Sequence, residues 1–144
     1  MIEVAISENP NNTILISIGD IFNRSFLSSY SGEKPVIEFM NYLKFDAMNL
    51  GFSEVMSNTY VISGLLKRLS FPAISINNER LKNMLELSAY TFIERGGLKI
   101  AIIGISNPEK VAELIPGSFI QPYIDYARKD GADLVILLSS IPLI

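Results

Sequence analysis

Four short polar segments of the sequence could carry chemistry, because each directly follows an apolar run that is typical of a buried strand. They are Gly19-Asp20 after TILISI, Gly51-Phe52-Ser53-Glu54 after DAMNL, Asn77-Asn78 after AISI, and Ser139-Ser140 after LVILL. Ligands of open α/β sheets bind in the crevice outside the carboxyl ends of the strands. We therefore expect any functional site of this chain to lie at these four segments.

The residue types at these segments restrict the chemistry. The chain has no His and no Cys, which removes the commonest general acid or base near neutral pH, the commonest transition-metal ligand and any thiolate nucleophile. Ser139 and Ser140 therefore have no base partner, and a serine nucleophile is disfavoured. Asp20 could hold a single hard cation such as Mg²⁺, with oxygen ligands from Asn23, Asn77 or Ser140. The alternative, which we favour, is that the Asp20 carboxylate caps the backbone of a turn.

The other polar residues of these segments also have ordinary structural interpretations. Glu54 is favoured as a carboxylate in the first turn of a helix, where the helix dipole stabilises a negative charge. Gly51 is interpreted as serving a tight turn, because a lone glycine after a strand is a weak phosphate-binding signal. The Asn77-Asn78 pair could hydrogen-bond a ligand, but we favour a turn into the next helix.

The segment from Asp20 to Glu33 is longer than most connections and is a candidate binding surface. It carries Phe22, Phe26 and Tyr30 among serines. We favour a second interpretation, in which these aromatic side chains pack as a lid over the crevice, above an inward-facing ring of Phe52.

Composition and charge exclude several classes of protein. The net charge is −3 with an isoelectric point near 4.9, and the 12 Lys and Arg residues are scattered, so we expect no nucleic-acid partner. The longest apolar runs are far shorter than the roughly 18 residues that span a bilayer, so we expect no membrane insertion. The absence of Cys leaves the redox compartment open. At 144 residues, of which 49% are hydrophobic, the chain is expected to form a single domain, residues 1–144.

The elements that position the four segments alternate between strands and helices, which predicts an α/β fold with a mainly parallel sheet flanked by helices. Strands are expected at residues 13–18, 46–51, 72–77, 89–94, 98–105 and 132–139. Arg95, Gly96 and Gly97 separate the fourth strand from the fifth, which indicates an antiparallel hairpin. The last strand is a nearly continuous apolar run of the kind that is buried on both faces in parallel sheets.

Apolar residues at helical spacing mark the helices. The stripes are Val36, Phe39, Met40 and Leu43 after Pro35; Ile62, Leu65, Leu66 and Leu69; Leu81, Met84 and Leu85; Val111, Leu114 and Ile115 after Asn107 and Pro108; and Ile120, Ile124 and Ala127 before Gly131. Residues 1–12 leave room for a further helix but hardly for a strand and a crossover, and only SIPLI follows the last strand. We therefore expect a partial domain whose sheet another domain or chain completes, and a homo-oligomer is compatible with this expectation.

Five collinear segments resemble the metallophosphoesterase domain of the 5′-nucleotidase family, whose members are calcineurin-like phosphoesterases. ENPNNTILISIGDIF resembles the strand leading to the GD motif of the family, EKPVIEFMNYLKFDAMNLG the helix and strand leading to GNHE, FPAISINN the FPVLSAN segment, GGLKIAIIGIS the hairpin strand, and GADLVILLSS the strand ending in LSH. The resemblance covers nearly the whole chain and implies part of an α/β/β/α sandwich.

The resemblance also implies a role for each matched position, and three positions depart from the family. The Asp of GD bridges two metal ions in such enzymes, and Asp20 matches it. The Asn of GNHE is a metal ligand and its His assists the leaving group; Phe52 and Ser53 stand in their places, whereas Glu54 matches the mainly structural glutamate. Ser140 stands in place of the histidine ligand of LSH. The first family motif, Asp-x-His, and the last, Gly-His-x-His, lie outside the matched sequence.

These departures have chemical consequences. A phenyl ring and neutral hydroxyls are poor ligands for divalent transition metals, and two-metal catalysis needs several anionic or imidazole ligands around ions roughly 3.5 to 4 Å apart. The leading hypothesis is therefore a degenerate domain, truncated at both ends, that is catalytically inactive, needs no cofactor and serves binding or scaffolding.

Two alternatives remain. One is a metal-dependent phosphoesterase with an altered site or with ligands from segments outside this sequence. The other is a purely structural interaction module that pairs through its unfinished sheet. Export is common in the family, but this sequence carries no signal peptide, so its compartment stays unknown.

Overall fold

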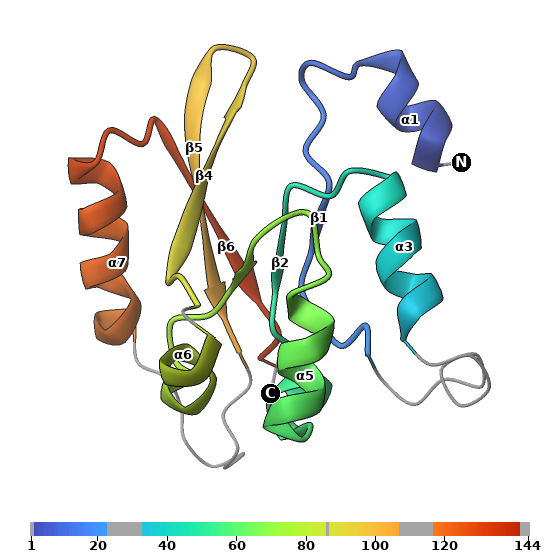
Figure 1. Cartoon of the computed structure of the whole chain (residues 1–144). Helices are drawn as coiled ribbons and strands as arrows, with labels where there is room; N and C mark the ends of the chain where they lie inside the picture. Colours follow the sequence, from blue (N-terminus) through green and yellow to red (C-terminus); the bar gives the residue numbers. More distant parts are fainter. Residues whose placement is uncertain (1, 23–32, 86, 107–116, 142–144) are drawn as a thin grey trace.

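The computed structural model describes residues 2–22, 33–85, 87–106 and 117–141 (Figure 1). The helices in these residues are α1 (Ile2–Glu8), α3 (Lys34–Tyr42), α4 (Phe52–Met56), α5 (Thr59–Leu66), α6 (Glu79–Leu85) and α7 (Gly117–Lys129). The strands are β1 (Ile16–Ser17), β2 (Ala47–Asn49), β3 (Ala73–Ile74), β4 (Tyr90–Arg95), β5 (Leu98–Ile105) and β6 (Leu134–Ser139). None of the described helices is long and apolar enough to cross a membrane.

The strands form two three-stranded sheets. In the first sheet, β1, β2 and β3 run parallel, with Ile16 opposite Ala47 and Met48 opposite Ala73. In the second sheet, β4 and β5 form an antiparallel hairpin, and β6 runs parallel to β5 with Leu134 opposite Ile100. The first sheet therefore has β1 and β3 at its edges, and the second has β4 and β6.

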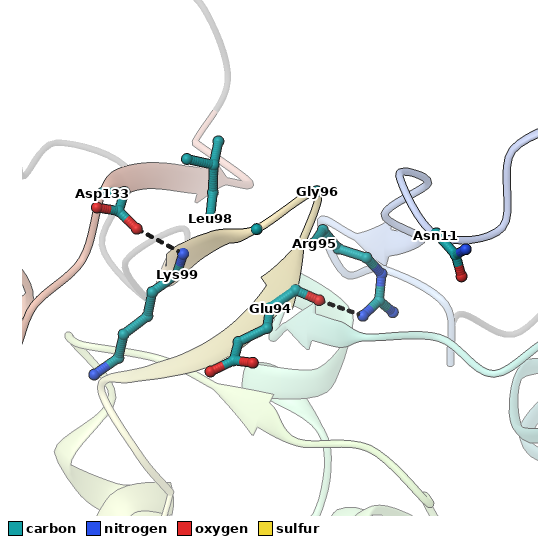
Figure 2. A pocket seen from close by; sticks show the side chains of 8 residues that line it. Asn11, Glu94, Arg95, Gly96, Leu98, Lys99 and Asp133 are labelled. Atoms are coloured by element: carbon teal, nitrogen blue, oxygen red, sulfur yellow. Dashed lines mark hydrogen bonds between the residues drawn. The ribbon is translucent and has the colours of Figure 1, made fainter.

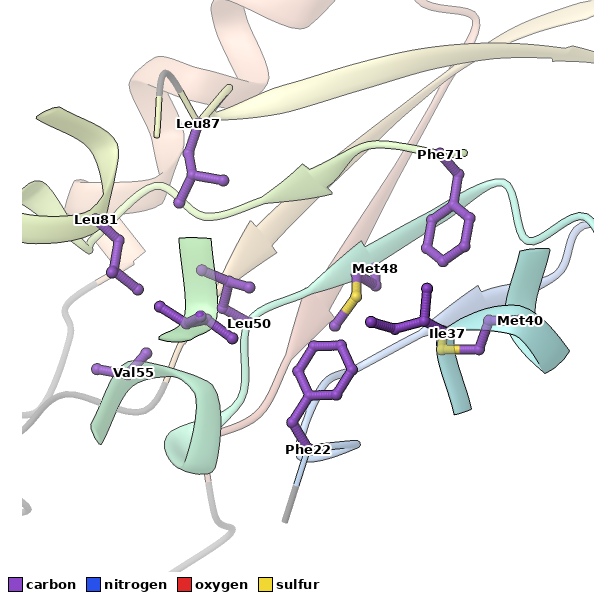
Figure 3. Close-up of a cluster of buried hydrophobic side chains, with 10 residues drawn as sticks. Phe22, Ile37, Met40, Met48, Leu50, Val55, Phe71, Leu81 and Leu87 are labelled. Atoms are coloured by element: carbon purple, nitrogen blue, oxygen red, sulfur yellow. The ribbon is translucent and has the colours of Figure 1, made fainter. Parts of the chain in front are cut away.

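The alternation of side chains along β2 explains how the first sheet is covered on both faces. Met48 and Leu50 point into a core shared with buried side chains of α3, α4, α5 and α6 (Figure 3). Ala47 points the other way and packs with Ile102 of β5 and Leu138 of β6. The first sheet thus lies between a helical layer and the second sheet.

The second sheet repeats this arrangement on its outer side. Ile103 and Ile105 of β5 pack against Ile120 and Ile124 of α7, and Ala101 packs against Ala127 of α7. The layers therefore follow the order helices, sheet, sheet, helix, with apolar side chains filling each of the three spaces between them.

Polar side chains define where several helices begin. Asn58 caps α5, because its side-chain oxygen accepts hydrogen bonds from the amides of Tyr60 at 3.0 Å and Val61 at 3.5 Å. Asn78 caps α6 through a 3.0 Å hydrogen bond from the amide of Leu81. These caps satisfy backbone N–H groups that have no partner inside the helix.

An ion pair joins the two sheets at the amino end of β2. The Asp46 carboxylate pairs with the guanidinium of Arg95 at the end of β4. Its second oxygen accepts a 2.8 Å hydrogen bond from the amide of Leu15, and the Arg95 Nε donates to the carbonyl of Thr13 at 3.0 Å. The hairpin of the second sheet is thereby attached to the chain that leads into β1.

The structure confirms the predicted α/β class, the hairpin and the α/β/β/α layering. The six predicted strands are present, but three of them are shorter than their apolar runs; the run at 13–18, for example, retains Ile16–Ser17. The helix predicted from Asn107 and Pro108 lies outside the described residues. The helix that carries Glu54 in its first turn is the short helix α4, and its end at Met56 was not predicted, because five residues are too few to show a helical period.

Two predictions of burial are wrong. Phe39 of α3 is 56% exposed, whereas its neighbour Ile37 is buried. Met40 is at the centre of the buried stripe, and at about 100° per residue Phe39 lies farther from it around the helix axis than Ile37 does. The second case is β6, where Leu134 and Leu137 are each 42% exposed although the apolar run predicted burial on both faces.

Candidate functional site

The structure brings the turns after β1 and β2 into direct backbone contact. A Cβ atom added to Gly19 would lie 2.2 Å from the amide nitrogen of Gly51, and one added to Gly51 would lie 2.3 Å from the amide nitrogen of Asp20. Gly19 also has a φ of +102°, which L side chains rarely adopt. Gly51 has ordinary dihedral angles, so a glycine is needed at this position only because a Cβ atom would not fit. The glycines therefore allow the close approach of two turns, whereas the sequence analysis interpreted Gly51 as serving a tight turn of its own chain segment.

Glu54 joins the same two turns through its carboxylate. The side chain is fully buried and accepts hydrogen bonds from the amides of Asp20 at 2.7 Å, Ile21 at 2.8 Å and Phe22 at 2.9 Å. It also accepts one from the amide of Gly51, which precedes α4, at 2.7 Å. The first-turn position predicted for Glu54 is correct, but most of its partners belong to the other turn. Such charge-assisted bonds stabilise a carboxylate that would otherwise be costly to bury.

Asp20 caps the beginning of α4 from outside the helix. Its carboxylate accepts a 2.8 Å hydrogen bond from the amide of Ser53, the second residue of α4. Its backbone has a φ of 59°, a left-handed conformation that Asp tolerates better than most residues. This geometry matches the capping interpretation of Asp20. A single cation bound to this exposed carboxylate stays a prediction.

The proposed oxygen ligands around Asp20 have other partners. The Asn77 side chain pairs with the backbone of Ser106, donating to its carbonyl and accepting from its amide, both at 2.8 Å. The Ser140 hydroxyl lies 3.5 Å from the carbonyl of Leu50. Asn23 lies outside the described residues. Asn77 could therefore bind a cation only by giving up a contact with the end of β5.

Buried neutral polar groups join the two sheets at this edge, and the sequence analysis missed them. The Asn49 amide nitrogen donates to the carbonyls of Ile105 at 2.9 Å and Ile18 at 3.2 Å. The hydroxyls of Ser75 and Ser106 are 2.9 Å apart and both residues are buried. A polar residue inside the apolar run DAMNL was the available signal for Asn49, because a buried amide needs a partner.

The Asn49 side-chain oxygen is a special case. It is buried and accepts no hydrogen bond from any described residue. A Cβ atom added to Gly104 would lie 2.6 Å from this oxygen, so the missing side chain of Gly104 is what admits the Asn49 amide between the sheets.

The lid predicted from aromatic residues is wrong for the two positions that can be assessed. Phe52 is 41% exposed, so its ring does not fill the crevice. Phe22 is 5% exposed and packs in the helix-side core with Met48 and Ile37 (Figure 3). The hydrogen bond from the backbone amide of Phe22 to Glu54 fixes the chain at this residue. Phe26 and Tyr30 lie outside the described residues.

Acidic residues are sparse at this edge. Among the described residues, no three His, Cys, Asp or Glu side chains are close enough together to hold a metal ion. Asp20 and Glu54 both bond to backbone amides of the two turns, and Phe52, Ser53 and Ser140 provide neither charge nor imidazole. The described donor set therefore does not fit a two-metal centre.

A shallow pocket of about 300 Å³ lies at the opposite end of β5, around the hairpin turn (Figure 2). Its cationic side chains already have partners: Arg95 pairs with Asp46, and the Lys99 ammonium donates to the carbonyl of Asp130 at 2.6 Å. The Asp133 carboxylate accepts a 2.8 Å bond from the amide of Lys99. These contacts hold the hairpin in place, and we assign the pocket no function.

Comparison with known proteins gives several relatives whose names are 5′-nucleotidase or nucleotide phosphoesterase. No family model matches the sequence. The chain is 29% identical over 123 residues to a snake venom 5′-nucleotidase of Naja atra, covering 81% of this chain and 23% of that protein. It is 27% identical over 164 residues to the trifunctional nucleotide phosphoesterase YfkN of Bacillus subtilis, covering 92% of this chain and 11% of that protein. The chain thus spans about a quarter or less of these relatives.

Solved structures share the fold. The 5′-nucleotidase precursor of Thermus thermophilus superposes with a TM-score of 0.79 at 22% identity, over 96% of this chain and 30% of that chain. The calcineurin-like phosphoesterase YfkN of Bacillus subtilis superposes with a TM-score of 0.73 at 20% identity, over 96% of this chain and 51% of that chain. Over most of its length the chain is thus similar in sequence to 5′-nucleotidases and a nucleotide phosphoesterase, and it shares its fold with a part of the solved 5′-nucleotidase and calcineurin-like phosphoesterase structures.

Proposed function

We propose that this phosphoesterase-like domain catalyses no two-metal hydrolysis by itself and serves binding or scaffolding. The observation that carries the proposal is how Asp20 and Glu54, the acidic residues of the matched motifs, are used. One oxygen of Asp20 accepts the amide of Ser53, and both oxygens of Glu54 accept backbone amides. These carboxylates hold turns together, and the neighbouring positions 52, 53 and 140 cannot replace them as metal ligands.

The proposal separates two properties that the family combines. The parts of the motifs that build the backbone are retained, namely the two glycines and Glu54. Of the matched parts that would ligate metal or protonate a leaving group, Asp20 is retained, and Phe52, Ser53 and Ser140 stand in place of the others. A domain selected for hydrolysis would need the second set, whereas a domain selected for its fold needs only the first. At most, we expect Asp20 to attract one weakly bound Mg²⁺, as exposed carboxylates do.

A phosphatase assay tests the proposal. The purified 144-residue chain is incubated with AMP and with p-nitrophenyl phosphate in the presence of Mn²⁺, Zn²⁺ or Mg²⁺, and bound metal is measured by elemental mass spectrometry. We expect rates equal to those of Asp20→Asn and of the control Asp125→Asn, whose exposed carboxylate lies on α7. Two tightly bound ions per chain, with turnover that Asp20→Asn abolishes and Asp125→Asn preserves, would overturn the proposal.

A second candidate is a metal-dependent phosphoesterase whose remaining ligands come from segments outside this sequence. The observation that favours it is the coverage of the relatives, of which this chain spans 23% and 11% in the two examples above. This candidate predicts that a longer form of the protein binds two metal ions and hydrolyses nucleoside monophosphates, with a rate that falls in Asp20→Asn. An inactive longer form would exclude it.

A further inference from the structure

The turn between α1 and β1 contains a sequence pattern for the attachment of an N-linked glycan. Asn11, Asn12 and Thr13 read Asn-x-Thr, with a residue other than Pro in the middle position. The enzymes that attach such glycans modify the side-chain amide of the first residue of this pattern, in segments that lie on the protein surface. The surroundings of Asn11 therefore decide whether a glycan fits.

Asn11 has the surroundings that a glycan requires. The residue is exposed and belongs to the turn that follows α1. Its backbone carbonyl accepts a long hydrogen bond from the amide of Gly96, at 3.4 Å. No described residue hydrogen-bonds to its side-chain amide. A sugar on the side-chain nitrogen would therefore displace no contact of the fold.

The neighbouring asparagines differ from Asn11 in both respects. The side-chain nitrogen of Asn12 donates to the side-chain oxygen of Asn9 at 3.1 Å, so these two amides are bound to each other. Neither of them has a Ser or Thr two residues later. Within the described residues, Asn11 alone combines the pattern with a free side-chain amide. A second match, Asn23-Arg24-Ser25, lies outside the described residues.

We propose that Asn11 is an acceptor site for an N-linked glycan, transferred from a lipid-linked oligosaccharide diphosphate in the secretory pathway. A bond forms between the Asn11 side-chain nitrogen and the first carbon of the oligosaccharide, and the bond from that carbon to the diphosphate oxygen breaks. The lipid diphosphate leaves with the electron pair of the broken bond, and the amide nitrogen releases one proton. This inference goes beyond the proposed non-catalytic function and does not depend on it.

The contact of Thr13 places the transfer before folding. The hydroxyl of this residue belongs to the pattern that the enzyme recognises. In the folded protein, it donates a 2.7 Å hydrogen bond to the carbonyl of Asn9 and thereby closes the turn. Because this bond occupies the hydroxyl, we expect the glycan to be added to the nascent chain before the turn forms.

A glycan at Asn11 would shield the end of the molecule that carries the hairpin turn. Asn11 lines the shallow pocket together with Gly96 and Gly97 (Figure 2). Leu98, which begins β5 beside this turn, is 46% exposed, and an N-linked glycan is bulky and solubilising. The turns after β1 and β2 lie at the opposite end of the sheets, so the glycan would leave them uncovered.

Cell-free translation with microsomal membranes tests the site. The 144-residue chain is translated behind a cleavable signal peptide, and the chains enclosed by the membranes are compared before and after digestion with peptide-N-glycosidase F. Every chain carries Asn23→Gln, which removes the second match. We expect the digestion to remove one glycan and to convert the modified Asn11 to an aspartate, which mass spectrometry locates.

Four variants distinguish the acceptor from its neighbours. Asn11→Gln and Thr13→Ala should abolish the glycan. Asn12→Gln leaves the pattern intact and should preserve it, and Thr13→Ser should preserve it because the hydroxyl is kept. Because the transfer precedes folding, a variant that fails to fold still reports on the site. Enclosed chains without a glycan at Asn11, or a glycan that survives Asn11→Gln, would overturn the inference.

Discussion

The two ends of the first sheet are each held by a carboxylate, but the carboxylates have different partners. At the carboxyl ends of the strands, Glu54 is fully buried and accepts four backbone amides. At the amino ends, Asp46 accepts one backbone amide and pairs with Arg95. The first carboxylate joins two turns of one sheet, and the second joins the two sheets.

The difference explains how metal-ligating side chains can be replaced while the fold around them is kept. The donors to Glu54 are backbone amides, which are present whatever side chains the donating residues carry. Replacing the side chains of Phe52 and Ser53 therefore leaves these backbone hydrogen bonds in place. The contact of Asp46 depends on another side chain and is lost if Arg95 changes. Backbone-directed carboxylates therefore make a fold tolerant of substitutions at its ligand positions.

Removing Glu54 is expected to have the largest effect on stability. Glu54→Ala leaves four amides without their acceptor, two of them in buried and two in partly buried hydrogen bonds. We expect a loss of about 4 kcal/mol, since each unsatisfied buried group costs about 1 to 3 kcal/mol. Chemical denaturation measures it. The control Glu38→Ala removes an exposed glutamate of α3 that lies 3.5 Å from Lys34, and should cost under about 0.5 kcal/mol. Equal losses would show that the buried contacts of Glu54 add nothing.

Filling the space between the two turns should cost somewhat less. Gly51→Ala forces a Cβ to within 2.3 Å of a backbone nitrogen, and we expect a loss of about 3 kcal/mol from the shift of the turns. Gly64→Ala is the matched control, because nothing lies within 4 Å of the added Cβ in α5. It should stabilise the protein by about 0.5 to 1 kcal/mol. If Gly51→Ala also stabilises the protein, the close contact between the turns is not real.

The contact at the amino ends should be weaker and sensitive to salt. Asp46→Asn keeps an acceptor for the amide of Leu15 but removes the charge opposite Arg95, whose side chain is 31% exposed. We expect a loss of about 1 kcal/mol at low ionic strength that shrinks in 1 M salt, because the pair is partly open to solvent. The loss for Glu54→Ala should change little with salt. An Asp46→Asn loss that salt leaves unchanged would remove the contrast between the two ends.

How much the sequence could predict follows the same division between local and distant contacts. The presence of the six strands, the helix with Pro35 and the hairpin at Gly96 and Gly97 depend on neighbouring residues, and they were predicted. The identity of Asp20 and Glu54 as motif residues was also readable. Their partners were not, because three of the four amides that donate to Glu54 lie 32 to 34 residues away in the chain.

The sequence also could not predict where side chains at the boundaries between layers would point. Apolar spacing predicted a strand at DAMNL, but it could not show that Asn49 would face a second sheet and bond to Ile105, 56 residues away. The aromatic residues of the segment from Asp20 to Glu33 led to the wrong prediction that Phe22 belongs to a lid, because residue type does not say which of two apolar spaces a side chain enters. The exposed edge of β6 depends on which strands are its neighbours, and a single run of residues carries no information on this point.

A third carboxylate, that of Asp130, accepts a hydrogen bond from a neutral side chain, and we expect its loss to have the smallest effect on stability. The Tyr90 hydroxyl of β4 donates to the Asp130 carboxylate beyond α7 at 2.9 Å. This hydrogen bond, followed by burial and the negative charge of Asp130, raises the pKa of Tyr90 above its ordinary value of 10.0. Because the folded-state pKa is raised, the contribution to stability is fully present below pH 10 and is lost as the pH rises through the folded pKa.

Tyr90→Phe should therefore lower stability slightly at pH 7, by less than Asp46→Asn does, and the difference from the unmodified chain should vanish at strongly alkaline pH. Denaturation at pH 7 and above pH 10 measures this trend. A difference that persists or grows at high pH would show that the phenol proton plays no part, and that Tyr90 contributes through packing alone.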